Sequence, residues 1–175
     1  MTPEQVALVQ DGFAKVAPTS EATAVLFYDR LFDIAPQMRA IFPDDMIEQR
    51  RKLMAMLAGV VKGLGNLEQV LPAASALAKR HVSYGAKAEH YPVVGAALLW
   101  TLEKGLGDGW TSEVADAWGT AYSTLSGYMI SEASQSGAEQ GYPVSESLVI
   151  VGHGMAAVRL VDELTRYALL AKPSR

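Results

Sequence analysis

The chain has 175 residues and a mass of 18.8 kDa, which is the size of one ordinary domain. Half of the residues are apolar and 19% are charged, which excludes a disordered chain, and the absence of cysteine excludes disulfides, thiolate metal sites and cysteine nucleophiles. The net charge of −4 comes without a basic block, so we expect no nucleic-acid partner. No apolar run approaches the ~20 residues of a membrane span and no secretory signal is visible, so we expect a cytoplasmic protein without membrane contact.

The N-terminal segment carries a strong helix start. Thr2 can cap the helix, Pro3 fits its first position, and Gln5 follows the cap by three residues, which is the spacing of a capping box. Apolar residues then recur at helical spacing until Pro18, which is expected to end the helix.

Most of the remaining chain predicts further helices, because apolar residues recur every three or four positions and capping residues precede them. The expected elements are a helix from Thr19 or Ser20 to Ala35, a short piece carrying Met38 to Phe42, a helix between Asp45 and Gly63, a short helix over 72–82, a helix from Pro92 to a loop over 105–109, and a long helix capped by Thr111. No alternating strand pattern occurs before residue 147. Residues 1–135 are therefore predicted to form one all-α domain.

The composition changes after this domain. Residues 136–147 contain three serines, two glycines and a proline among acidic and amide residues and are predicted to be a linker. Residues 148–175 predict a strand, a turn and a helix, and Gly152 to Ala157 fits the dinucleotide-binding pattern G-x-G-x-x-A. This stretch resembles the opening of the flavin/NAD(P)H domain of nitrite-reductase large subunits. A working unit needs a second parallel strand, so we expect an incomplete fragment that binds neither FAD nor NAD(P); a strand-like tail or a docking helix is the alternative.

The three histidines, His81, His90 and His153, are the strongest candidate metal or catalytic groups in a chain without cysteine. They form no HExxH pair and no cluster with zinc spacing. His81 has two interpretations: a partly buried histidine satisfied by a backbone carbonyl, or an axial ligand of a cofactor iron.

Six short segments bear on this choice: Leu26–Phe32, Ile41-Phe42, Glu48–Leu53, Lys79–His81, His90–Gly95 and Asp116–Gly119. In this order they resemble the globin family, and specifically the branch of bacterial flavohaemoglobins and single-domain haemoglobins. The interval of 32 positions from Gln49 to His81 and that of 14 positions from Tyr28 to Phe42 match the intervals of that branch. The resemblance implies a three-over-three helical sandwich packed around one haem b, an iron protoporphyrin IX.

The resemblance also assigns residues to the haem. His81 is implied to form the one protein bond to the iron, which leaves the opposite face open to a gas. Phe42 and Leu53 are implied to be apolar walls of the haem pocket, a role that is physically the same as core packing.

Tyr28 and Gln49 are implied to act on bound O2. Because O2 on ferrous iron takes negative charge, a hydroxyl and an amide donor would each stabilise it by about 1–3 kcal/mol. Gln49 is a weak iron ligand, which favours an open site. The alternatives are a core tyrosine whose hydroxyl reaches the surface, and an exposed helix residue at position 49.

On the proximal side the resembling branch has a tyrosine and a glutamate that polarise the histidine and make it a more basic ligand. Tyr91 matches the tyrosine. The glutamate would fall near residue 135, where this chain has Gln135, with Glu132 nearby. We therefore expect less electron donation to the iron than in the branch.

The resemblance implies a haem globin that binds O2 reversibly, with NO and CO as further ligands, and that acts as a nitric oxide dioxygenase converting NO and bound O2 to nitrate. A reductase must return the iron to the ferrous state, and we expect it to be external or lost. The alternatives are a non-enzymatic O2 carrier, store or sensor, and a cofactor-free helical interaction module.

Overall fold

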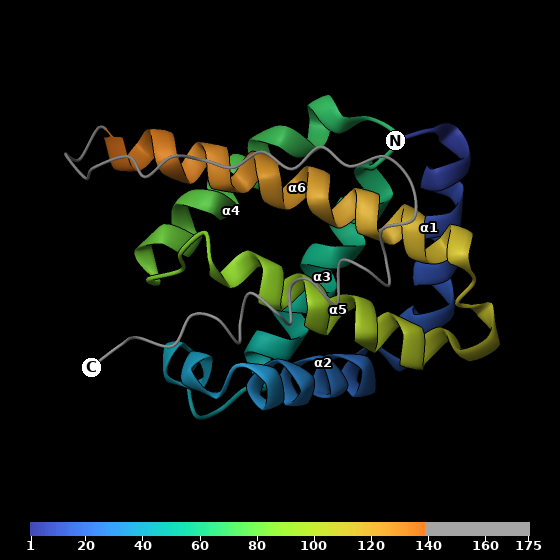
Figure 1. Cartoon of the computed structure of the whole chain (residues 1–175), viewed down its shortest axis with the longest axis horizontal. Helices are drawn as coiled ribbons and strands as arrows, with labels where there is room; N and C mark the ends of the chain where they lie inside the picture. The colour runs from blue at the N-terminus through green and yellow to red at the C-terminus, as the bar shows by residue number, and fades with distance from the viewer. Residues whose placement is uncertain (139–175) are drawn as a thin grey trace.

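The computed structural model describes residues 1–138, so the predicted fragment 148–175 and most of the predicted linker lie outside the described residues. The described part is helical and contains no strand, which confirms the all-α prediction. Its α-helices are α1 (Pro3–Val16), α2 (Ser20–Ile34), α3 (Ile47–Gly63), α4 (Leu67–Ser83), α5 (His90–Leu106) and α6 (Ser112–Ala138), and its 3-10 helices are η1 (Ala17–Thr19), η2 (Pro36–Ile41) and η3 (Gly107–Gly109) (Figure 1).

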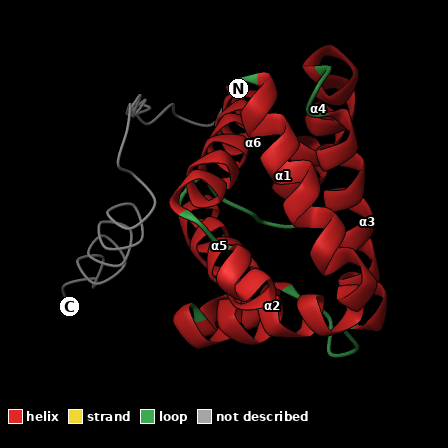
Figure 2. Cartoon of the chain, turned by 90° about the vertical axis from the view of Figure 1, so that its right-hand side faces the viewer, coloured by secondary structure: helices red, strands yellow, loops and turns green. Residues whose placement is uncertain are grey.

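The six α-helices pack as two layers of three, with α1, α3 and α4 against α2, α5 and α6 (Figure 2). The most extensive packing joins α2 to α5, α4 to α6 and α1 to α6. Leu31 of α2 and Leu102 of α5 are almost fully buried in the core. Burial of each such side chain contributes about 1.5–3 kcal/mol to the free energy of unfolding. This arrangement is the predicted three-over-three sandwich. Among residues 1–138 no helix is long and apolar enough to cross a membrane.

The predicted start of α1 is confirmed in detail. The Thr2 hydroxyl accepts a hydrogen bond from the Gln5 backbone N–H at 3.2 Å, and the Gln5 side chain accepts one from the Thr2 backbone N–H at 3.0 Å. This reciprocal pair satisfies two N–H groups that a helix start otherwise leaves without partners. The α-helix ends at Val16, and the chain passes through η1, which contains Pro18.

The predicted start of α4 at Pro72 is wrong, because the helix begins five residues earlier, at Leu67. Pro72 is the sixth residue of α4, where proline removes one backbone hydrogen bond and crowds the carbonyl of the preceding turn, and the burial of Val70 and Ala74 outweighs that cost. A Cβ atom on Gly63, at the end of α3, would overlap the Val70 side chain, so this glycine permits the close turn between α3 and α4.

Two other boundaries differ from the sequence prediction. α6 continues to Ala138, three residues into the predicted linker 136–147, and α5 includes Gly105 and Leu106, which were expected in a loop. Glycine in a helix costs about 1 kcal/mol relative to alanine and serine costs less, and the tertiary packing of the rest of the helix outweighs these costs.

Candidate functional site

A cluster of aromatic rings holds Tyr28 in place on α2. Tyr28 is only 4% exposed. Its ring centroid lies 4.9 Å from that of Phe27, 5.9 Å from Phe32 and 5.5 Å from Phe42, the last in an edge-to-face arrangement. Phe42 follows η2, so the short 3-10 helix returns the chain to the face of α2 that carries Tyr28. The structure thus brings together Tyr28 and Phe42, two of the predicted site residues.

The hydroxyl of Tyr28 meets Gln49, the third residue of α3. Burial raises the pKa of Tyr28, while a hydrogen bond with the Gln49 side chain and the positive charge of Arg50 act in the opposite direction. The phenol is therefore neutral and keeps its proton to donate. Leu53, one turn further along α3, is half-buried and packs against the core. The first turns of α3 thus place an amide and an apolar wall beside Tyr28.

His81 lies in the last turn of α4, with its ring oriented by its own helix. Its Nδ1 atom is 2.9 Å from the carbonyl oxygen of Leu77. Because a carbonyl only accepts hydrogen bonds, Nδ1 carries the proton and Nε2 keeps a lone pair. Burial lowers the pKa of His81, the charge of Arg80 lowers it further, and the Leu77 bond partly opposes both. The ring is thus the neutral imidazole that binds metals, with its backbone partner already in place.

Tyr91, near the start of α5, stacks on His81. The two ring centroids are 6.3 Å apart and the rings are inclined by 26°. Burial raises the pKa of Tyr91. Tyr122 of α6 donates a hydrogen bond of 2.6 Å to the backbone oxygen of Tyr91. The sequence interpretation missed Tyr122. The available signal in the sequence was Gly95, a glycine inside a predicted helix and one turn after Tyr91. The structure explains this glycine, because a Cβ atom there would lie 2.5 Å from the Tyr122 ring.

The carboxylate that connects α6 to α4 is Glu132. It is half-buried and accepts a hydrogen bond from the hydroxyl of Ser75. Gln135 is exposed, and its amide donates a 3.3 Å hydrogen bond to Ser131 in its own helix. Of the two residues considered for the missing glutamate, the structure thus places Glu132 against the helix that carries His81.

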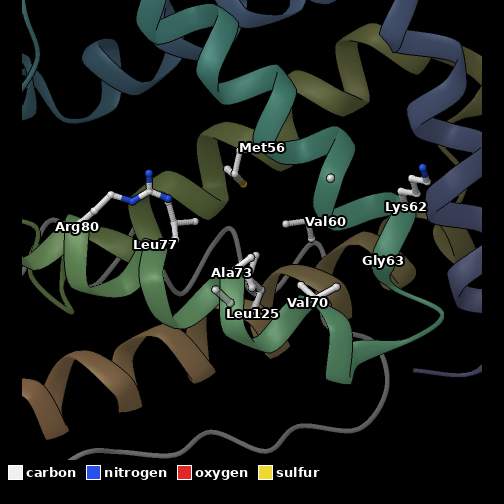
Figure 3. Close-up of a pocket in the computed structure, with 11 residues that line it drawn as sticks. Met56, Val60, Lys62, Gly63, Val70, Ala73, Leu77, Arg80 and Leu125 are labelled. Carbon is white, nitrogen blue, oxygen red and sulfur yellow. The ribbon is translucent and has the colours of Figure 1, made fainter.

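A cavity of about 500 Å³ lies between α3 and α4, with Leu125 of α6 at its base (Figure 3). Met56 and Val60 face Leu77 across it (Figure 3). None of the predicted site residues lines it. Met56 follows Leu53 by three residues and Leu77 precedes His81 by four, so the cavity continues the space between the two helices that carry the predicted distal and proximal residues.

The residues present fit a haem group. A haem requires a neutral ring nitrogen for its iron, an apolar slot for its flat ring and a cation near its carboxylates. His81 supplies the nitrogen, the cavity between α3 and α4 is lined mainly by apolar side chains, and Arg80 lies at its edge. Tyr28 is carried by α2, Gln49 by α3 and His81 by α4. Among residues 1–138, no group of three or more His, Cys, Asp or Glu side chains could hold a metal ion directly.

Comparisons with known proteins identify the family of this chain. The globin family model matches residues 25–129. The flavohemoprotein of Bordetella parapertussis is 32% identical over 133 residues, covering 74% of this chain and 33% of that protein, and the flavohemoprotein of Rhodopirellula baltica is 29% identical over the same share of each chain. The chain thus spans about a third of the length of the curated relatives it matches.

Solved structures give the same result for the fold. A bacterial globin from Campylobacter jejuni superposes with a TM-score of 0.70 and 26% identity, covering 78% of this chain and 99% of that one. An engineered carbene transferase from Rhodothermus marinus superposes with a TM-score of 0.73 and 23% identity, covering 81% and 99%. With the family model matching more than half of the residues, this chain belongs to the globin family.

Proposed function

We propose that this haem globin holds haem b on His81, binds O2 reversibly, and acts as a nitric oxide dioxygenase that receives electrons from a reductase. The observation that carries the proposal is the pairing of a buried tyrosine hydroxyl with the Gln49 amide, on the helices opposite a histidine held neutral. Membership of the globin family by itself supports the statement that this chain is a haem globin.

The distal residues Tyr28 and Gln49 provide two hydrogen-bond donors in an apolar environment. When bound, haem supplies an iron that takes O2 and an electron, and the overall reaction combines NO, O2 and one electron into nitrate. A negatively charged oxygen beside Tyr28 and Gln49 would accept hydrogen bonds from both, and each such bond contributes about 1.5–3 kcal/mol. Phe42 and Leu53 exclude water, which strengthens both bonds.

The proximal residues fix how the iron ligand is presented. The hydrogen bond from Nδ1 of His81 to Leu77 selects the tautomer that directs a lone pair from Nε2. Tyr91 stacks on the ring and restricts its rotation. A carbonyl partner makes the imidazole less basic than a carboxylate partner would, so this geometry favours reversible gas binding over strong electron donation.

The test begins with absorption spectra of the purified chain after haem reconstitution, in its ferric, ferrous and CO forms. We expect a Soret band in each form and a CO spectrum typical of a histidine ligand, both lost in His81→Ala. NO consumption is then measured in aerobic buffer with a reductase and compared with the same reductase plus free haem. Turnover no faster than this control would overturn the dioxygenase proposal and leave an O2 carrier, store or sensor.

A further inference from the structure

The charges of this protein are divided between two regions of opposite sign. Residues 1–138 contain 11 Lys and Arg and 15 Asp and Glu. Helices α3 and α4 carry six of these cations but only two of the acids, so they bear a charge of +4, whereas the rest of the described chain bears −8. The six cations are Arg50, Arg51, Lys52, Lys62, Lys79 and Arg80.

The outward sides of the two helices carry cations and small side chains. Between Arg51 and Lys62, the exposed residues of α3 other than cations are Ala55, Ala58 and Gly59. The two acids, Glu48 and Glu68, lie in the first turns of their helices. Arg51 pairs with Glu48 at 3.1 Å, but within residues 1–138 no ion pair involves Lys52, Lys62, Lys79 or Arg80. Four cations are thus available to an outside partner.

We call the exposed cations of the two helices the basic face: Arg51, Lys52, Lys62, Lys79 and Arg80. The two helices lie together along one side of the molecule (Figure 2). Lys62 of α3 and Arg80 of α4 line the same cavity, at opposite ends of it (Figure 3). The basic face also includes exposed apolar side chains of α4, Leu71 at 37% and Val82 at 40% exposure. The acids of these helices are confined to the first turns, so the rest of the face carries an excess of positive charge that complements a negatively charged partner.

We propose that the basic face docks a negatively charged flavoprotein that reduces the haem iron. The inference rests on the proposed function, because only a turning-over haem needs repeated reduction. In each encounter one electron leaves the reduced flavin, the ferric iron becomes ferrous, and no atom or bond is transferred. Gln49 and His81 lie on the same two helices as these cations, so a partner on this face contacts the helices that carry the proposed distal and proximal residues. Opposite charges also raise the encounter rate and orient the partner before contact.

A compact protein suits this face better than a membrane or a nucleic acid. The basic face is bounded by a remainder that carries −8, and the whole chain carries −4. An extended polyanion such as a duplex or an anionic bilayer reaches beyond the face and is repelled by those acids. A small acidic protein can contact the cations of the basic face without also lying against the surrounding acids.

The test uses purified flavodoxin, an acidic protein that carries FMN, as the probe and the haem-loaded full chain as its partner. The double variant Lys52→Glu with Lys79→Glu reverses two charges on the basic face, and neither residue lines the cavity. The matched control, Lys15→Glu with Lys104→Glu, makes the same change in net charge on α1 and α5. Binding to the ferric protein is measured by calorimetry, and the rate of haem reduction by reduced flavodoxin by stopped flow.

At low salt we expect the basic-face variant to bind flavodoxin at least ~10-fold more weakly than the wild type and to be reduced by it at least ~10-fold more slowly. In the control variant, both quantities should change less than ~2-fold. The difference should shrink at about 0.5 M salt, where charges are screened. Free photoreduced FMN, which needs no docking surface, should reduce all three proteins equally, which separates docking from damage to the haem site.

The proposal would be overturned if the two double variants changed flavodoxin binding and haem reduction equally. It would also be overturned if the reduction rate did not depend on the salt concentration. So would tighter binding of the wild type to phosphatidylglycerol vesicles or to duplex DNA than to flavodoxin. The binding measurement involves no NO chemistry, so a protein that docks flavodoxin normally but consumes no NO would refute the proposed function and leave the docking surface intact.

Discussion

The hydroxyl of Tyr28 is the most informative single group to remove. In Tyr28→Phe the ring keeps its packing against Phe27, Phe32 and Phe42, so the fold is retained and only the hydroxyl is lost. A hydrogen bond to a charged acceptor contributes about 1.5–3 kcal/mol, and 1.4 kcal/mol corresponds to a factor of ten. We therefore expect O2 to dissociate about 10 to 150 times faster from the variant.

The assay is stopped-flow displacement of O2 by CO from the ferrous protein. Tyr84→Phe serves as the matched control, because Tyr84 is 67% exposed and its hydroxyl should not affect the rate. Since Gln49 bonds to Tyr28, the double variant with Gln49→Leu should show a loss that differs from the sum of the single losses. A dissociation rate within twofold of the wild type, with an unchanged CO spectrum, would refute the assignment of Tyr28 as a distal donor.

Four further predictions test the scaffold and the proximal side. His81→Ala should lose the histidine-ligand spectrum and regain it when free imidazole is added, as seen by absorption. Burial lowers the pKa of His81 in the folded state, so as the pH falls the unfolded chain binds this proton before the folded chain does. The wild-type apoprotein should therefore lose more unfolding free energy between about pH 7 and pH 5 than His81→Ala loses, as measured by urea denaturation. Gly95→Ala should cost about 1–3 kcal/mol of unfolding free energy because its Cβ meets the ring of Tyr122, whereas Gly127→Ala, with no atom within 4 Å, should stabilise by about 0.5–1 kcal/mol. Thr2→Ala should cost about 1 kcal/mol by thermal denaturation, because it removes the capping box.

Local signals in the sequence predicted where several helices begin. Thr2 and Gln5 satisfy backbone groups within a single turn, so their spacing alone identifies the start of α1. Thr111 likewise accepts a hydrogen bond from the Val114 N–H at the start of α6. The start of α4 could not be predicted in this way, because the preference of Pro72 for a helix start was outweighed by the burial of Val70 against α3. Burial depends on which helix is adjacent, and no local pattern reports that.

The candidate site, too, could be predicted from the sequence only in part. Intervals along the chain were sufficient to propose Tyr28, Gln49, Phe42 and His81, because a resemblance keeps residue types at set spacings. The protonation state of His81 and the contact between Tyr28 and Gln49 required coordinates, since both depend on burial and on atoms from other turns or helices. Tyr122 was missed because its role is a contact with the backbone of another helix.

The sequence by itself determined an all-α domain over residues 1–135, the ends of several helices and the absence of thiol chemistry, because hydrophobic periodicity, capping and composition are properties of consecutive residues. Only the tertiary structure decided that Lys62 of α3 and Arg80 of α4 line one cavity on a protein of charge −4, that Tyr28 is buried against Phe42, and that burial lowers the pKa of His81. Charge, burial and proximity are long-range quantities, and they arise only when the helices pack.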